Sequence, residues 1–168
     1  MRYGCSRVLF GLLAIVFGSS WSTTLHAQAQ TIEACSLLSK DDVEHATQRE
    51  EQSEPDLTPL RDGGSACSFE NAQLVLFTGS NSGAAWNAYL KNFGHGTEAR
   101  HPLPGIGDAA YFFYPKPRDQ YEGVHAVVVV NVGQHTLAVS VEAEEGKAAE
   151  SVQPQALALA KLVTTKLR

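Results

Sequence analysis

No apolar stretch of this sequence is long enough to cross a membrane. The longest run, residues 8–17, is interrupted only by Gly11 and would span about 15 Å as a helix, about half of the hydrocarbon thickness. The sequence also lacks a run of basic residues, a Cys-x-x-Cys pair and a standard set of zinc ligands. These absences argue against a membrane-spanning protein, a nucleic-acid-binding protein and a thiol redox enzyme.

The N-terminal segment has the order of a secretory signal peptide. Arg2 and Arg7 precede the apolar run, and a polar stretch then leads to the small residues of the Ala-Gln-Ala tripeptide at 27–29. This order predicts a signal peptide at residues 1–29 and a mature chain that begins at Gln30, with cleavage after residue 27 as the second choice. An uncleaved anchor is the alternative, and the shortness of the run disfavours it. We expect a periplasmic or secreted protein with no membrane insertion after cleavage.

Removal of residues 1–29 leaves 139 residues, the size of a single domain at 30–168. The mature chain then carries 11 basic residues against 18 acidic ones, a net charge of −7. Such a domain repels phosphate backbones, so nucleic acid is not an expected partner. Five of the acidic residues fall at 49–64 among two prolines and two glycines, and we expect an acidic, solvated loop there.

Only Cys35 and Cys67 remain after cleavage of the signal. Two cysteines in an oxidising compartment predict one disulfide. It would close a loop of 33 residues, both ends counted, and contribute about 3 to 4 kcal/mol in the chain-entropy model. Metal and redox roles are disfavoured because two distant cysteines supply too few ligands and lack the close spacing of a redox pair.

Hydrophobic periodicity and turn residues predict elements in the order α-β-β-α-β-β-β-α. The expected helices begin at residue 39, span 84–92 and span 154–167, and the expected strands are 66–69, 74–78, 109–114, 124–132 and 136–143. Strands that follow one another in runs predict an antiparallel sheet. The expected fold is therefore α+β, with about five strands and helices packed against one side.

Three short segments resemble small exported bacterial domains of unknown function: CSLLSKDDVEHA, a later CSF at a strand, and PGIGDAAYF. The chain looks like the CSLL-type secreted and lipoprotein families and, more loosely, like Mog1/PsbP-like sandwiches. The resemblance implies a disulfide and an antiparallel α/β sandwich, and it implies no activity. Unlike the lipoprotein members, this chain has no lipobox, since Cys5 precedes the apolar run and Cys35 follows a charged segment.

The segment from Gly105 to Ala110 matches the G-x-G-x-x-A pattern of dinucleotide-binding proteins. That pattern requires a preceding strand and a following helix, whereas here a proline-containing loop precedes and a strand follows. We therefore expect a tight turn in which Asp108 accepts hydrogen bonds from backbone amides. No cofactor is expected.

The histidines offer weak metal candidates. His95, Glu98 and His101 lie in one loop, but their spacing fits no standard zinc pattern, so no metal is expected. His125 and His135 lie on or beside neighbouring strands and could face each other, and cross-strand packing explains them equally well.

An aromatic strand at 111–114 has more apolar surface than one face of a sheet can bury. Either both of its faces are covered, or one pair of rings is available for binding. Basic and aromatic residues follow, and they predict a cationic, aromatic-edged patch formed by Tyr114, Lys116, Arg118 and Tyr121.

Two functions remain open. The preferred hypothesis is an exported, non-catalytic binding or interaction module whose partner is an unknown protein or a small anionic ligand. The alternative is a small metal-assisted hydrolase that uses His95, His101 and a carboxylate. The first is favoured because no nucleophile, base or complete ligand set is assembled in the sequence.

Overall fold

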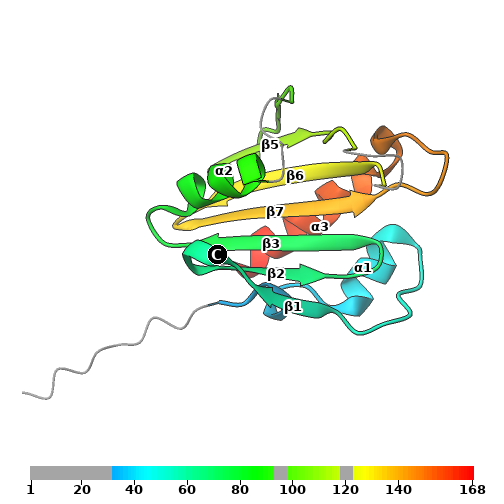
Figure 1. The fold of residues 1–168 in the computed structure, drawn as a ribbon, viewed down its shortest axis with the longest axis horizontal. Coiled ribbons are helices and arrows are strands. Elements are labelled where there is room, and N and C mark those ends of the chain that lie inside the picture. The colour runs from blue at the N-terminus through cyan, green and yellow to red at the C-terminus, as the bar shows by residue number, and fades with distance from the viewer. Residues whose placement is uncertain (1–31, 93–97, 118–122) are drawn as a thin grey trace, which may run out of the picture. The chain divides into compact units, whose positions relative to one another are not determined.

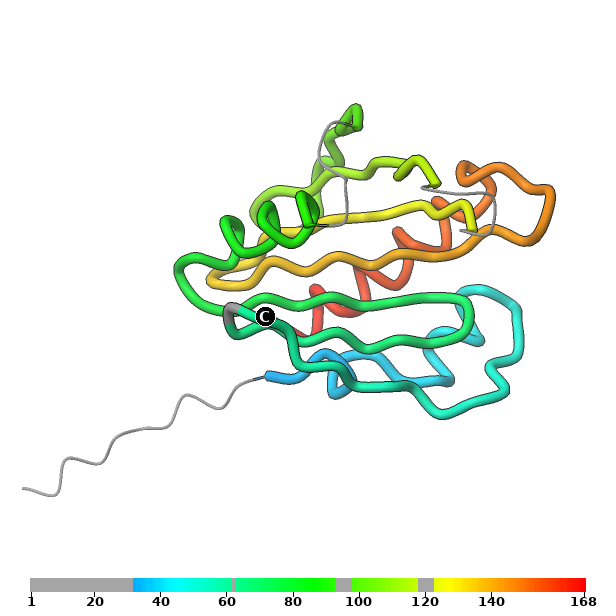
Figure 2. The backbone as a smooth tube through the Cα atoms, in the orientation of Figure 1, coloured from blue at the N-terminus to red at the C-terminus, as the bar shows by residue number. Residues whose placement is uncertain are grey.

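Seven strands form one antiparallel sheet in the described part of this computed structural model. The structure describes residues 32–92, 98–117 and 123–168, and at Asp62 it describes the backbone but not the side chain. Across the sheet the order is β1-β2-β3-β7-β6-β5-β4, so β7 lies between β3 and β6 (Figure 1, Figure 2). The strands are β1 (Asp56–Pro59), β2 (Gly64–Ser68), β3 (Ala72–Thr78), β4 (His101–Pro102), β5 (Ala109–Phe113), β6 (His125–Val132) and β7 (His135–Glu142). The predicted signal peptide at 1–29 and its cleavage site before Gln30 lie outside the described residues.

The helices of the described part are α1 (Lys40–Thr47), α2 (Ser82–Asn92) and α3 (Gln153–Lys166), with the 3-10 turns η1 (Ala34–Ser36), η2 (Arg61–Gly63) and η3 (Ala149–Val152). A capping box starts α1: the Asp42 amide donates to Ser39 Oγ at 3.2 Å, and the Ser39 amide donates to Asp42 Oδ2 at 3.0 Å. Pro154 lies in the first turn of α3, where its missing N–H has no helical partner to lose. These two helices start where the sequence predicts them. None of the described helices is long and apolar enough to cross a membrane.

The helices lie on both faces of the sheet, which corrects the expectation that they pack against one side. Residues of α1 and α3 pack with Leu74 and Val139, whereas α2 packs with Phe77 on the other face. Figure 1 shows α2 in front of the sheet and α3 behind it. Strand β3 explains this arrangement. It carries buried apolar side chains on both faces of the sheet, so each face must be shielded from water.

The expected five-strand sheet and its element order are also wrong, because β1 and β4 have no hydrophobic pattern. All four residues of β1 are exposed, and β4 has two residues, both exposed. Both strands form through backbone pairing, β1 with β2 and β4 with β5. The helices and strands therefore run α-β-β-β-α-β-β-β-β-α, and β1 lies within the segment that was expected to be a loop.

The acidic segment at 49–64 also contains a buried carboxylate. Glu51 is only 1% exposed, and its carboxylate accepts hydrogen bonds from the backbone amides of Glu70 and Asn71 at 2.6 and 3.1 Å. The Asn71 side-chain amide donates a third bond at 2.8 Å. Glu51 thus provides hydrogen-bond acceptors for the amide groups of the turn between β2 and β3. This part of the segment is therefore anchored to the sheet and not solvated.

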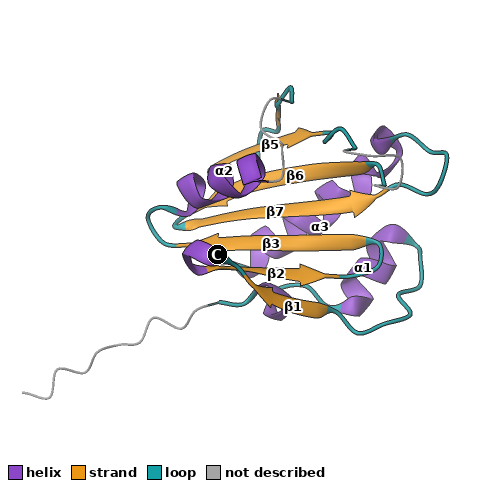
Figure 3. Cartoon of the chain, viewed as in Figure 1, coloured by secondary structure: helices purple, strands orange, loops and turns teal. Residues whose placement is uncertain are grey.

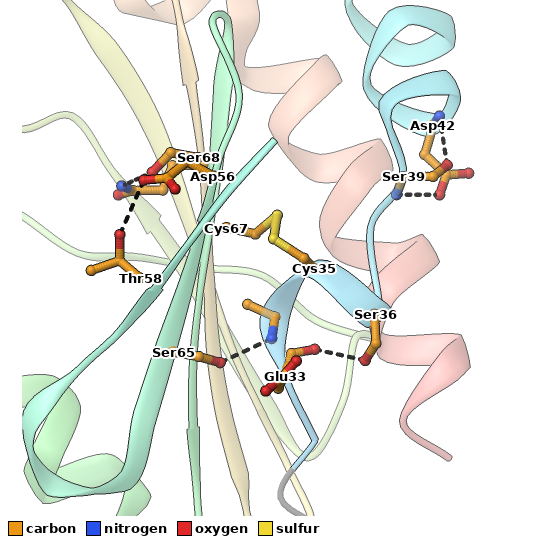
Figure 4. The surroundings of a disulfide bond; sticks show 12 residues. Glu33, Cys35, Ser36, Ser39, Asp42, Asp56, Thr58, Ser65, Cys67 and Ser68 are labelled. Atoms are coloured by element: carbon orange, nitrogen blue, oxygen red, sulfur yellow. Dashed lines mark hydrogen bonds between the residues drawn. A yellow bond between two sulfur atoms is a disulfide. The ribbon is translucent and has the colours of Figure 1, made fainter. Parts of the chain in front are cut away.

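The predicted disulfide is confirmed. Cys35 of η1 and Cys67 of β2 form an S–S bond of 2.05 Å, with their Cα atoms 5.0 Å apart (Figure 4). Beside it, the Ala34 amide donates to Ser65 Oγ at 2.9 Å. The bridge and this hydrogen bond attach the N-terminal part of the domain to β2, the second strand of the sheet.

The turn at Gly105–Asp108 is structural, as predicted. Asp108 Oδ2 accepts a hydrogen bond from the Gly133 amide at 2.7 Å, which links this turn to the turn between β6 and β7. Gly107 has a φ of +57°, and a Cβ atom there would lie 2.4 Å from the Asn131 carbonyl oxygen. Only glycine fits this position, because the chain at Asn131 lies too close for a side chain. A strand, β5, follows this turn, so the turn lacks the helix N-terminus that binds a pyrophosphate.

Candidate binding groove on the sheet

Short side chains hollow out the face of the sheet on which α2 lies. The register of β2, β3 and β7 places Ala66, Val75 and Ala138 in one row and Ser68, Gln73 and Ser140 in the next row. The opposite face of the same strands carries Cys67, Leu74 and Val139, which pack in the α3-side core. In β7 the two faces differ clearly in side-chain volume, because Ala138 and Ser140 lie on the α2 face and Leu137, Val139 and Val141 lie on the other.

Helix α2 forms an aromatic wall above this floor. The Trp86 and Tyr89 rings are stacked with centroids 5.7 Å apart, and Tyr89 meets the Phe77 ring edge-on at 5.9 Å. Trp86 Nε1 donates to the Tyr111 hydroxyl at 2.9 Å, which ties the wall to β5. Burial raises the pKa of Tyr89, so its phenol stays neutral and adds no charge to the wall.

The hollow between the wall and the floor has a volume of about 370 Å³ and is called the sheet groove below. Leu90 continues the wall, Val127 and Phe113 extend the floor, and Thr58 and Leu60 form the rim on the β1 side. Figure 3 shows that α2 lies over one end of the strands and leaves the rest of that face without a helix. The volume lies in the range of small-molecule sites, about 300 to 1,000 Å³.

One end of the sheet groove is polar. Ser68, Gln73, His125 and Ser140 line both the groove and an adjoining hollow of about 200 Å³. Glu70 and Glu142 also line that hollow. Within the described part of the chain, no hydrogen bond or ion pair occupies the Ser140 hydroxyl, the His125 imidazole or the Glu142 carboxylate. This polar end therefore offers uncommitted groups next to an apolar cavity.

The predicted aromatic patch is only partly visible. Tyr114 is half-buried, its hydroxyl donates to Gln153 Oε1 at 2.8 Å, and burial together with the nearby Glu150 carboxylate raises its pKa. Lys116 is exposed, and Arg118 and Tyr121 lie outside the described residues. A patch built from all four residues stays a prediction.

Both faces of the aromatic strand are covered, which decides between the two alternatives for this segment. Phe112 and Tyr114 pack against the α3-side core, and Tyr111 and Phe113 pack in the α2-side core. The rings therefore contribute to two cores, because successive side chains of a strand point to opposite faces of the sheet.

The structure does not assemble the histidine candidates. His101 lies in β4 and stacks on Phe112 at 4.8 Å, while Glu98 is half-buried and His95 lies outside the described residues. The described residues contain no group of three ligands that could hold a metal ion. The idea that His125 and His135 face each other is wrong: the antiparallel register pairs His125 with Glu142 and His135 with Val132, at opposite ends of β6 and β7.

The groove residues carry a weak signal that the sequence analysis missed. Ala138 and Ser140 in β7 alternate with the larger apolar residues Leu137, Val139 and Val141, and β2 consists of small residues throughout. That alternation marks a face of small side chains in each strand separately. It becomes informative only when β3 is known to lie between these strands.

Comparisons with protein-family models, with curated proteins and with solved structures find no match for this chain. The function of the groove therefore has to be inferred from its own side chains.

Proposed function

We propose that this protein is an exported, non-catalytic binding module that takes a small molecule with an apolar or aromatic body into the sheet groove. The observation that carries the proposal is an aromatic-walled cavity of about 370 Å³ whose polar end includes His125 and Ser140, which have no side-chain partner among the described residues. Small-molecule sites combine a mostly apolar lining with a few convergent polar groups in the same way.

The apolar part of the groove would supply the affinity. An aromatic ring placed against Trp86 would leave water on its apolar surface and would gain offset or edge contacts with the indole. The hydrogen bond between Trp86 and Tyr111 already fixes the indole, so little side-chain entropy is lost on binding.

The polar end favours binding over catalysis. Ser140 and His125 lie on neighbouring strands on the same face, but no hydrogen bond joins them. A serine hydroxyl is a weak nucleophile unless a base accepts its proton, and Ser140 has no such base in hydrogen-bond contact among the described residues. These groups are suited to accept or donate hydrogen bonds to a bound molecule.

Trp86 provides the readout for a direct test. The chain contains 2 tryptophans, so a Trp21→Phe background leaves Trp86 as the single emitter in the full chain. Phenylbutanol, a neutral probe with an aromatic body, should change the Trp86 emission saturably and should show one site by calorimetry.

Filling the groove should abolish this binding. Ser140→Phe places a ring in the space that Ser140 now leaves open, and Ser68→Leu is a second filling variant from β2. Ala109→Phe is the matched control, because Ala109 lies on the same face of the sheet, is exposed and does not line the groove. Absence of saturable binding in the parent protein, or undiminished binding in both folded filling variants, would contradict the proposal.

A further inference from the structure

We infer that the ligand of the sheet groove is a cation: an apolar body lies against Trp86, and a protonated amine lies at the polar end beside Ser140 and Glu142. This inference rests on the proposed function and adds the charge of the ligand to it. The juxtaposition that carries it is an apolar cavity that opens directly into a carboxylate-lined hollow, with His125 and Ser140 shared by both.

Among the described residues, the acidic and basic side chains other than histidine that line the groove and the adjoining hollow are carboxylates. Neither the groove nor the adjoining hollow is lined by a lysine or arginine of the described chain, whereas Glu70 and Glu142 line the hollow. At this end of β7 the Arg49 guanidinium donates to the backbone oxygen of Glu142 at 2.6 Å. Arg49 also lines a different hollow, where the hydrogen bond and charge of Lys147, and to a smaller extent the charge of Arg49, lower the pKa of Glu144. Arg49 therefore binds the backbone of Glu142, and the Glu142 carboxylate has no ion pair among the described residues.

The Glu142 carboxylate is confined at this place. The Glu142 amide donates to the Asn71 carbonyl oxygen at 3.0 Å, so the backbone is fixed at the end of β7. The side chain lies against the backbone of Gly123, in space that a Cβ atom at that position would need. A half-buried carboxylate that has no partner among the described residues would gain most from a ligand that brings a positive charge.

The available groups match the donors of an ammonium ion. A primary ammonium has three N–H donors and no acceptor. Glu142 can accept one of them in a charge-assisted bond, and the hydroxyl of Ser140 and a ring nitrogen of His125 can accept the others. An anionic ligand would instead place its charge beside Glu70 and Glu142, where no lysine or arginine of the described residues lines the hollow.

Three probes of equal length separate this inference from the proposed function. Phenylbutylamine, phenylbutanol and phenylbutyrate share one aromatic body and differ in the charge of the head group. At neutral pH and low salt, the amine should bind about tenfold more tightly than the alcohol, and the acid should bind least, because a hydrogen bond to a charged group is worth more than a neutral one.

Glu142→Gln should lower the affinity for phenylbutylamine by about tenfold and leave the affinity for phenylbutanol unchanged, since the amide keeps the shape and removes the charge. Glu145→Gln is the matched control, because it removes the same charge from an exposed position outside the groove. If the amine binds no more tightly than the alcohol, or if Glu142→Gln has no effect on it, the inference is wrong while the groove remains a binding site. If none of the three probes binds, the proposed function itself fails.

Discussion

The indole nitrogen of Trp86 and the phenolic oxygen of Tyr111 are joined by a hydrogen bond of 2.9 Å that connects α2 to β5. The Arg100 guanidinium lies over the Tyr111 ring, 4.8 Å from its centroid, in a cation–π contact. This bond determines how the indole faces the sheet groove.

Tyr111→Phe should lower the free energy of unfolding by about 1 kcal/mol, because the partly buried indole N–H loses its acceptor. It should also weaken phenylbutanol binding, because the aromatic wall is no longer fixed. Urea unfolding and a probe titration measure the two effects. Tyr114→Phe is the control: it removes the bond to Gln153 on the opposite face and should cost similar stability without changing probe affinity. Equal loss of affinity in both variants would contradict a specific role for Tyr111.

The disulfide should account for a large part of the stability of the N-terminal segment. Replacing Cys35 and Cys67 together by alanine should lower the free energy of unfolding by roughly 2 to 4 kcal/mol, since the unfolded chain regains its loop entropy. Denaturation with and without a reducing agent provides the measurement. The parent protein should become less stable on reduction and the double variant should not respond, so a response of the double variant would point to another cause.

Glu51→Gln should destabilise the protein by about 1 to 3 kcal/mol, because an amide cannot accept all three hydrogen bonds that the buried carboxylate accepts. Chemical denaturation reports the loss, and faster hydrogen exchange at the Glu70 and Asn71 amides would localise it. Glu50→Gln is the neighbouring control, since Glu50 is exposed, and its stability should stay within about 0.5 kcal/mol of the parent. Equal stability of both variants would remove the anchoring role of Glu51.

Asp42 should make the stability of α1 dependent on pH. Burial alone would raise the pKa of Asp42, but hydrogen bonds from the backbone and side chain of Ser39 and the bond and charge of Lys166 together hold the pKa below its ordinary value. A lowered folded-state pKa adds stability above the unfolded value of about 3.9, and this stability is lost as the pH falls through the folded-state value.

Asp42→Ala should therefore cost about 1 kcal/mol at neutral pH, and the difference from the parent should shrink as the pH falls below about 3.9. Thermal unfolding across that range measures it. Asp41→Ala is the control, because Asp41 shares the first turn of the helix but lacks the bonds to Ser39 and Lys166. A cost that is independent of pH would show that the ionised form of Asp42 contributes nothing.

Elements whose signal is local could be predicted from the sequence. The Ser39 capping box, the proline in the first turn of α3 and the alternation of Leu137 and Val139 in β7 depend on residues a few positions apart. The disulfide follows from the cysteines that remain after the predicted cleavage. The capping box, the proline and the alternation are confirmed because neighbouring residues determine them before any tertiary contact forms, whereas the disulfide required only that two cysteines be left to pair.

Only the tertiary structure decided the edge strands, the face on which α2 packs and the groove. β1 and β4 form through backbone pairing, which leaves no periodic pattern of side chains. The apolar stripe that contains Trp86 and Leu90 predicts that one side of α2 is buried. The stripe carries no information about which face of the sheet that side packs against. The groove joins side chains from Thr58 to Ser140 because β7 lies between β3 and β6, and this strand order is set by the burial of both faces of the sheet together.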